Sequence, residues 1–247
     1  MNPNLIIIGA QKSGTTSMHR YLDKHPDIHM SYPIKEPGYF LPSSYIIPLL
    51  SNKNIKIKSK EDLLENNMKI NYKNETVFGE SSTYYTIGDL SRKYKVAKSI
   101  YKLCSEIKFI YIVRNPLARL KSNYSHEISR GYTNISFEKY MKSNNRAVKT
   151  SMYFYQLQPY LEYFNINIFR FVEFDKFVTN PKICLQEIYK FLGVSNFEIN
   201  SSALKVHNKS NTDEIEFSNG NLDTNVLSIL KKDMDQFNSL TGTTLNL

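Results

Sequence analysis

The stretch Leu5-Ile6-Ile7-Ile8-Gly9-Ala10-Gln11-Lys12-Ser13-Gly14-Thr15-Thr16-Ser17 decides the fold, because a strand signal runs directly into a turn. The run from Leu5 to Ile8 is short, continuous and apolar, as in a parallel strand that is covered on both faces. The residues from Gly9 to Thr16 are mostly small and form a predicted turn. A helix is predicted from Ser17, ending at His25-Pro26. This order predicts the first unit of a parallel sheet.

The rest of the chain repeats this alternation of strands and helices. Further strands are predicted at 76–79, 108–113 and 168–173. Four helices are predicted from apolar residues that share one helical face, namely Leu117/Leu120/Tyr124, Phe154/Leu157/Leu161, Leu185/Ile188/Leu192 and Val226/Leu230/Met234/Phe237. The pattern predicts an α/β fold: one doubly wound domain over residues 1–247, with a central parallel sheet flanked by helices and right-handed crossovers.

Two polar stretches interrupt the pattern. Residues 41–75 are rich in Lys, Asn and Ser, with an apolar patch at 45–50, and residues 129–150 are polar and aromatic. We expect both to be loops over the active face, and plain surface insertions are the alternative.

The composition is that of a globular protein with a basic excess. The 247 residues are 41% hydrophobic and 22% charged, and the net charge is +9, which favours an anionic partner of some kind. Cys104 and Cys184 match no metal or redox spacing and are predicted to be buried free thiols. The sequence shows no signal-peptide pattern and no apolar run of about 20 residues, so we expect a cytoplasmic protein without membrane contact.

The turn from Gly9 to Thr16 has the chemistry of a phosphate site. A loop between a strand and a helix directs backbone N–H groups at one point, and the helix N-terminus adds positive potential. A Walker A loop has its lysine directly after the second glycine, whereas here Thr15 follows Gly14 and Lys12 precedes it. From that position Lys12 is able to reach the oxygen that bridges a phosphate and a transferred group, where charge builds as the leaving group departs.

This loop resembles the 5'-phosphosulfate loop of sulfotransferases that use 3'-phosphoadenosine 5'-phosphosulfate (PAPS), in particular the branch with the heparan sulfate enzymes and many bacterial members. The resemblance implies a P-loop NTPase-like fold and a lysine, Lys12, on the bridging oxygen. It implies PAPS as co-substrate, adenosine 3',5'-bisphosphate (PAP) as product, and no required metal. It also implies nucleotide contacts from Gln11, Lys12, Ser13, Gly14, Thr15, Thr16 and Ser17.

A second anion motif follows the strand at 108–113. Arg114 stands at its carboxyl end, where doubly wound sheets bind ligands, and Ser122 lies about two turns into the next helix on a face shared with Arg119. The spacing of Arg114 and Ser122 resembles the family's 3'-phosphate motif. ATP has no phosphate at that position, so this motif favours PAPS over ATP.

The segment Lys35-Glu36-Pro37-Gly38-Tyr39-Phe40 resembles the one that carries the catalytic glutamate in the heparan-type enzymes. Transfer to a hydroxyl needs a base for the acceptor's proton, and the match assigns that role to Glu36, with Lys35 as a neighbour that tunes its charge. Other members use a histidine on the segment that corresponds to 79–85, which here contains none. His126 and His207 are outside candidates.

Weaker matches extend the resemblance to about residues 4–240. The segment 206–211 stands where the family has a cofactor-covering loop, so Lys209 and Ser210 are predicted nucleotide contacts, with a plain surface loop as the alternative.

The predicted activity is sulfuryl transfer from PAPS to a hydroxyl or amine of a small acceptor, either a specialised metabolite or a soluble carbohydrate. A P-loop nucleotide kinase is the enzymatic alternative, and a basic nucleic-acid-binding domain is the non-enzymatic one. No recognised nucleic-acid motif appears, so we expect no nucleic-acid partner. The sequence leaves the oligomeric state open.

Overall fold

A computed structural model describes residues 2–67, 76–104, 106–143, 145–199 and 222–247. Its centre is a parallel sheet of five strands in the order β2-β3-β1-β4-β5. The strands are β1 Leu5–Gly9, β2 Ile28–Met30, β3 Val77–Glu80, β4 Lys108–Val113 and β5 Phe169–Glu173. Four of the five strands are predicted by the sequence. The edge strand β2 is not, because its three residues include His29 and form no apolar run.

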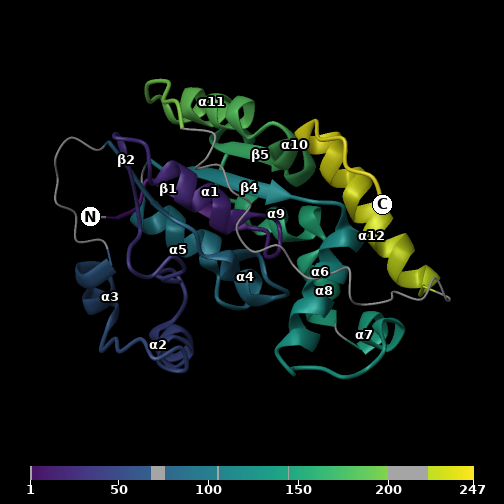
Figure 1. Cartoon of the computed structure of the whole chain (residues 1–247). Helices are drawn as coiled ribbons and strands as arrows, with labels where there is room; N and C mark the ends of the chain where they lie inside the picture. Colours follow the sequence, from purple (N-terminus) through teal and green to yellow (C-terminus); the bar gives the residue numbers. More distant parts are fainter. Residues whose placement is uncertain (1, 68–75, 105, 144, 200–221) are drawn as a thin grey trace.

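Helices surround the sheet, and Figure 1 shows α10 and α11 beside β5, α2 and α3 at one end of the molecule, and α6, α7 and α8 at the other. The α-helices are α1 Thr15–Leu22, α2 Ser43–Ser51, α3 Lys60–Asn67, α4 Leu90–Lys93, α5 Val96–Leu103, α6 Pro116–Ser129, α7 Phe137–Ser143, α8 Asn145–Thr150, α9 Tyr153–Leu161, α10 Phe174–Thr179, α11 Pro181–Leu192 and α12 Thr224–Thr241. Two short 3-10 helices complete the described elements, η1 Thr83–Thr86 and η2 Ile166–Ile168. The four helices predicted from apolar spacing are therefore confirmed as α6, α9, α11 and α12.

The alternation of side chains along β1 divides the core into two layers. Leu5 and Ile7 belong to a cluster with residues of α1, α10 and α11, whereas Ile6 and Ile8 belong to a cluster with residues of α2, α5, α9 and α12. All four side chains are fully buried. Because helices cover both faces of the sheet, the central strand β1 is apolar without alternation, as the run from Leu5 to Ile8 predicted.

The two stretches expected to be active-face loops or surface insertions contain helices, and their role over the active face stays a prediction. Within 41–75 lies α2, where the apolar patch supplies the buried Ile46 and Leu50. Within 129–150 lie α7 and α8, whose Tyr140 and Val148 pack in a third cluster with Leu120 of α6. In both stretches tertiary burial stabilises helices that have weak local signals.

The strand order places the two predicted phosphate motifs side by side. β1 pairs with β4, with Gly9 opposite Tyr111. The loop after β1 and Arg114 after β4 therefore leave the same edge of the sheet from neighbouring strands, where the chain changes direction across the sheet. The segments after β2 and β3, with Glu36 and Thr83, leave that edge too.

Both cysteines are buried free thiols, as predicted, and burial raises the pKa of Cys104 to about 11 and that of Cys184 to about 12. None of the helices in the described part of the chain is both long enough and apolar enough to cross a membrane.

Candidate active site

The backbone of the loop after β1 is held in a conformation that only some residues adopt easily. Lys12 has a φ of 69° and Gly14 a φ of 79°, both in the left-handed region. Gly9 has a φ of 151°, and a Cβ there would lie 2.1 Å from Thr86 Oγ1. That hydroxyl donates to the carbonyl of Ile8 at 2.7 Å, so η1 packs against the base of the loop. Only glycine fits at position 9 without displacing Thr86.

The loop ends at the N-terminus of α1, which is open to an anion. Gly14 occupies the N-cap position without a side-chain cap, and the first turn contains no acidic residue. Helix N-termini carry unpaired N–H groups and a partial positive charge. The residues assigned to the loop are either buried (Ser13, Thr15, Ser17) or half-buried (Gln11, Lys12, Gly14, Thr16).

Positive charge is concentrated around Lys12. Burial lowers the pKa of Lys12, and repulsion from Arg119, Arg114 and Arg130 lowers it further. The structure therefore brings the lysine of the first motif and the arginine of the second within electrostatic reach of each other. No acidic group is among the causes that act on Lys12, so an anion would relieve the repulsion.

Arg114 is fixed by an aromatic ring and a hydroxyl. Its guanidinium carbon lies 4.7 Å from the centroid of the Phe174 ring. Its backbone N–H donates to the Tyr153 hydroxyl at 3.2 Å. A Cβ at Gly14 would lie 3.0 Å from the Phe174 ring, so that ring adjoins both motifs.

Helix α6 carries the rest of the second motif. Asn115 caps the helix by accepting from the N–H of Ala118 at 2.7 Å, and Pro116 occupies the first turn as predicted. Ser122 is 2% exposed and lies on this helix three residues after Arg119. Its convergence with Arg114 on one phosphate stays a prediction.

The sequence predicts only that Arg119 shares a helix face with Ser122, but the structure places it close to Lys12. It is fully buried, donates to Ser151 Oγ at 2.6 Å and to the carbonyl of Ala147 at 2.8 Å, and its Nη1 has no partner among the residues that the structure describes. Burial lowers the pKa of Arg119. A buried guanidinium that forms no ion pair with a carboxylate in the described part of the chain adds unneutralised positive charge next to Lys12.

Glu36 is joined to the phosphate loop through one lysine. The Nζ of Lys35 lies 3.1 Å from Glu36 Oε1 and donates to Thr15 Oγ1 at 3.3 Å. Thr83 Oγ1 also donates to Glu36 Oε1, at 3.0 Å. The Glu36 side chain remains 23% exposed, so it is accessible from outside the protein. The candidate base therefore lies one lysine away from the N-terminus of α1.

A second cation lies on the other side of Glu36. Lys53, just after α2, donates to the Tyr84 hydroxyl at 2.6 Å. Burial alone would lower the pKa of Lys53, but the hydrogen bond to Tyr84 and the negative charge of Glu36 outweigh it and the pKa is raised. Tyr132 contributes to the same effect, so a residue of the stretch 129–150 lies within electrostatic reach of Lys53 in the stretch 41–75.

Two buried groups near the site were missed by the sequence analysis. Glu80 ends β3 and is 1% exposed, although the segment 79–85 had been considered only for its lack of a histidine. His19 of α1 hydrogen-bonds Ser81 Oγ at 2.7 Å, and burial and the charge of Lys35 lower its pKa to about 3. An acid at the carboxyl end of a predicted strand was the available signal for Glu80.

The remaining candidates have different outcomes. Lys209, Ser210 and His207 lie outside the described residues, and their assignment stays a prediction. Burial and the charges of Lys12 and Arg130 lower the pKa of His126, which places this histidine within electrostatic reach of the phosphate loop. The described residues contain no group of three His, Cys, Asp or Glu side chains arranged to hold a metal ion.

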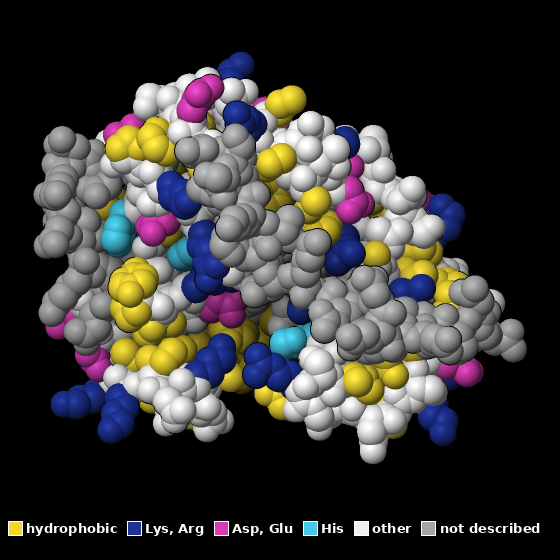
Figure 2. Space-filling model, in the orientation of Figure 1, with side chains coloured by type: hydrophobic (Ala, Val, Ile, Leu, Met, Phe, Trp, Pro, Cys, Tyr) yellow, Lys and Arg dark blue, Asp and Glu magenta, His cyan; other side chains and the backbone are white. Residues whose placement is uncertain are grey.

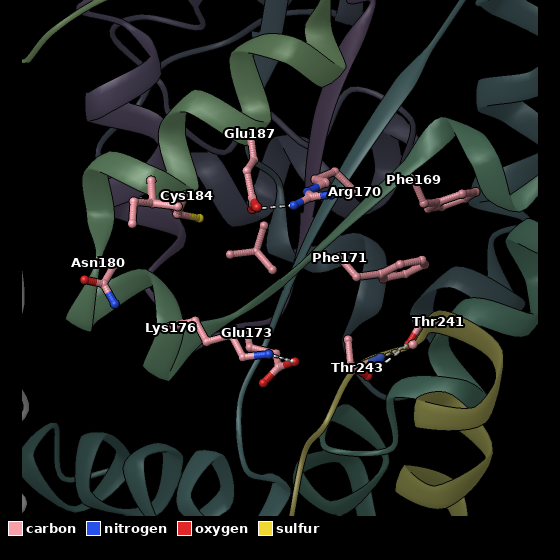
Figure 3. Close-up of a pocket in the computed structure, with 13 residues that line it drawn as sticks. Phe169, Arg170, Phe171, Glu173, Lys176, Asn180, Cys184, Glu187, Thr241 and Thr243 are labelled. Carbon is pink, nitrogen blue, oxygen red and sulfur yellow. Dashed lines mark hydrogen bonds and ion pairs between the residues drawn. The ribbon is translucent and has the colours of Figure 1, made fainter.

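Lys and Arg side chains gather near the middle of one face, with hydrophobic and acidic side chains between them (Figure 2). A separate cavity of about 500 Å³ lies along β5 and is lined by residues of β5, of α11 and of the chain at the end of α12. Figure 3 shows how these side chains lie. None of the predicted site residues lines that cavity, and ion pairs such as Arg170–Glu187 neutralise its charges.

Comparisons with known proteins assign the chain to a family. The family model described as "Sulfotransferase domain" matches residues 2–239. The chain is 27% identical to heparan sulfate glucosamine 3-O-sulfotransferase 5 of Mus musculus, over 99% of this chain and 73% of that protein. It is 25% identical to the human bifunctional heparan sulfate N-deacetylase/N-sulfotransferase 2, over 79% of this chain and 22% of that protein.

Solved structures support the fold. A sulfotransferase from Alicyclobacillus acidocaldarius superposes with a TM-score of 0.76 at 22% identity, covering 99% of this chain and 98% of that one. The sulfotransferase domain from the curacin biosynthetic pathway superposes with a TM-score of 0.55 at 15% identity. The P-loop NTPase-like architecture expected from the sequence is thus confirmed, and the chain belongs to the sulfotransferase family as a PAPS-dependent enzyme.

Proposed function

We propose that this enzyme transfers the sulfuryl group of PAPS directly to a hydroxyl or amine of a small acceptor, with Glu36 as the base and Lys12 stabilising the leaving phosphate. The observation that carries the proposal is the contact chain from Thr15 through Lys35 to Glu36, with separations of 3.3 and 3.1 Å. It connects a proton acceptor to an anion site through one side chain, which is the arrangement that in-line transfer needs.

The site fits a nucleotide with phosphates at both ends. An uncapped helix N-terminus and the lysine and threonines of the loop suit the 5'-phosphate. Arg114 and the buried Ser122 suit the 3'-phosphate. The buried Nη1 of Arg119 has no partner within the described ranges of the chain, which fits a site whose counter-charge is supplied by an anionic ligand.

The protein residues have separate tasks in the transfer. Glu36 accepts the proton of the attacking hydroxyl or amine as the new bond to sulfur forms. Lys12 stabilises the negative charge that remains on the phosphate oxygen when the old S–O bond breaks, and no metal is needed for that task. Lys35 orients the Glu36 carboxylate, because its Nζ contacts Oε1 at 3.1 Å.

The acceptor side of Glu36 contains Lys53 and Tyr84, a cation and an aromatic ring in contact. Such a pair suits either a sugar or an aromatic metabolite. Of the two acceptor classes, a soluble carbohydrate is favoured over a specialised metabolite, because a relative is named as a heparan sulfate glucosamine sulfotransferase.

A nucleotide test separates this function from its alternatives. We expect the protein to bind immobilised PAP and to be released by free PAP but not by ATP. Release by ATP would favour a kinase, and release only by nucleic acid would favour a basic binding domain. Transfer should continue in EDTA.

An acceptor screen with matched variants tests the chemistry. The enzyme, PAPS and either a metabolite extract or an oligosaccharide panel should yield a product heavier by one SO₃ group. Glu36→Gln should lower kcat at least a hundredfold and leave PAP affinity within about threefold, since general-base catalysis contributes about 10²–10⁴ in rate. Glu138→Gln, at an exposed ion pair, is the control. Unchanged turnover in Glu36→Gln would remove Glu36 as the base.

A further inference from the structure

The segment that carries Glu36 is attached to the sheet by two hydroxyl groups. The backbone N–H of Gly38 donates to Ser82 Oγ at 2.8 Å, and that of Phe40 donates to Tyr85 Oη at 3.2 Å. Both hydrogen bonds are buried. Because each hydroxyl oxygen accepts a backbone hydrogen, its own proton must be donated elsewhere.

Both of those protons are accepted by a single carboxylate. Ser82 Oγ donates to Oε2 of Glu80, and Tyr85 Oη donates to Oε1 of Glu80 at 2.6 Å. Two relays therefore run in parallel, each from a backbone N–H through a hydroxyl to one oxygen of Glu80. Glu80 ends β3 and is 1% exposed, so the relays terminate inside the protein on a strand of the central sheet.

We propose that Glu80 is a positioning residue, which holds the segment 36–40, and with it Glu36, at the site through Ser82 and Tyr85. This inference rests on the proposed function of Glu36. Glu80 itself is buried and is assigned no proton transfer. It fixes the backbone two and four residues after the base, and Thr83 from the same turn contacts the Glu36 carboxylate directly at 3.0 Å.

The direction of the hydrogen bonds explains why an acid stands at this position. An ionised carboxylate only accepts, and here it accepts at both oxygens. An amide would present an NH₂ group to one hydroxyl that already accepts a backbone N–H, so that hydroxyl would lose the acceptor of its own proton. A buried, unsatisfied polar group destabilises the arrangement, so glutamine should disrupt one relay and thereby loosen the short segment that both relays hold.

Protonation of Glu80 should loosen the same segment. Burial raises the pKa of Glu80 to about 7, although the hydrogen bonds from Ser82 and Tyr85 act in the opposite direction. The charged or titratable groups that face it are Glu36 and Lys35 from the loop after β2, Tyr85 from η1, Cys104 after α5 and Tyr160 from α9. A protonated Glu80 must donate to a hydroxyl that already accepts, so the relays are intact only at pH values above about 7.

The test measures hydrogen exchange in the segment 36–40 and, separately, kcat in Glu80→Gln. Glu162→Gln is the control, because Glu162 is exposed and follows the last residue of α9. Hydrogen exchange of the Gly38 and Phe40 amides should become at least tenfold faster at pH 8. kcat should fall at least tenfold, while PAP affinity changes less than threefold. The decrease in wild-type kcat from pH 8 to pH 6 should be smaller in Glu80→Gln.

Tyr85→Phe is a milder second variant if Glu80→Gln does not fold, because it keeps the ring and removes one relay. It should speed exchange at Phe40 more than at Gly38, and Ser82→Ala should do the reverse. In a double variant of Glu80→Gln with Tyr85→Phe or with Ser82→Ala, the fold-changes in exchange rate and kcat should be smaller than the product of the two single-variant fold-changes.

Two results would overturn the inference: unchanged exchange of both amides in Glu80→Gln, or faster exchange with unchanged kcat. Failure of the proposed base gives a different result, because Glu36→Gln would then retain its turnover while the exchange of Gly38 and Phe40 in Glu80→Gln would still increase.

Discussion

The guanidinium carbon of Arg114 lies 4.7 Å from the centroid of the Phe174 ring. The same ring also lies against the phosphate loop, since a Cβ at Gly14 would be 3.0 Å from it. One aromatic side chain at the start of α10 therefore adjoins both of the predicted phosphate motifs.

Replacing this ring should weaken nucleotide binding. Phe174→Leu keeps an apolar side chain but removes the cation–π contact, which contributes about 0.5–2 kcal/mol, and so PAP affinity should fall about 2- to 30-fold. Isothermal titration with PAP measures it. Phe191→Leu is the control, because the cation over that ring at 5.5 Å is Lys108, at the opposite end of β4 from Arg114. Equal PAP affinity in wild type and Phe174→Leu would show that the ring has no such role.

Lys12→Ala should separate catalysis from binding. If Lys12 stabilises the leaving phosphate, kcat should fall about 10²–10³-fold, the loss that follows removal of one oxyanion donor. PAP affinity should fall much less, because the helix N-terminus and Arg114 remain. Steady-state kinetics and PAP titration give both quantities, with exposed Lys142→Ala as the control. A kcat within tenfold of wild type would contradict the assignment.

Gly9→Ala should destabilise the fold as well as the site. Its Cβ would lie 2.1 Å from Thr86 Oγ1, and the φ of 151° is strained for any other residue. We expect a loss of about 3 kcal/mol or more in the free energy of unfolding, from strain and overpacking together. Gly131→Ala is the matched control: its φ is 69°, nothing lies within 4 Å of its Cβ, and the expected loss is about 1–2 kcal/mol. Urea unfolding compares the two, and equal losses would show that the Thr86 contact is unimportant.

Asp233 of α12 should stabilise the protein by capping the first turn of α9. It accepts from the backbone N–H groups of Phe154 at 3.0 Å and Tyr155 at 2.8 Å, where α9 has no side-chain cap of its own. Asp233→Ala leaves two half-buried donors without this acceptor, so the free energy of unfolding should fall by about 1–3 kcal/mol. Asp235→Ala, two residues away at an exposed ion pair, should change it by less than about 1 kcal/mol.

Asp233 should also make the free energy of unfolding depend on pH. Burial raises the pKa of Asp233 from 3.8 to about 6, against the opposing backbone hydrogen bonds. The folded state then holds its proton more tightly than the unfolded state, so this contribution is present below about pH 4 and is lost as the pH rises through about 6. Relative to Asp233→Asn, the wild type should lose stability on the order of 3 kcal/mol between pH 4 and pH 7. A pH-independent difference between the two proteins would refute the shift.

The sequence by itself determined the elements whose signals are local. Four strands, the turn from Gly9 to Thr16 and four amphipathic helices could be predicted, because strand composition, small residues in turns and helical periodicity are properties of neighbouring residues. The parallel order then implied that Lys12 and Arg114 meet at one edge of the sheet. The three-residue strand β2 and helix α2 could not be predicted, since both depend on burial against distant segments.

The tertiary structure alone decided which side chains support the site. Nothing near Glu80 in the chain shows that its carboxylate terminates two hydrogen-bond relays from Gly38 and Phe40, more than 35 residues away. The same holds for the contact of Phe174 with Arg114 and Gly14. A sequence pattern reports periodicity within one element, whereas the ionisation of a buried acid and the orientation of a guanidinium depend on groups that only folding brings together.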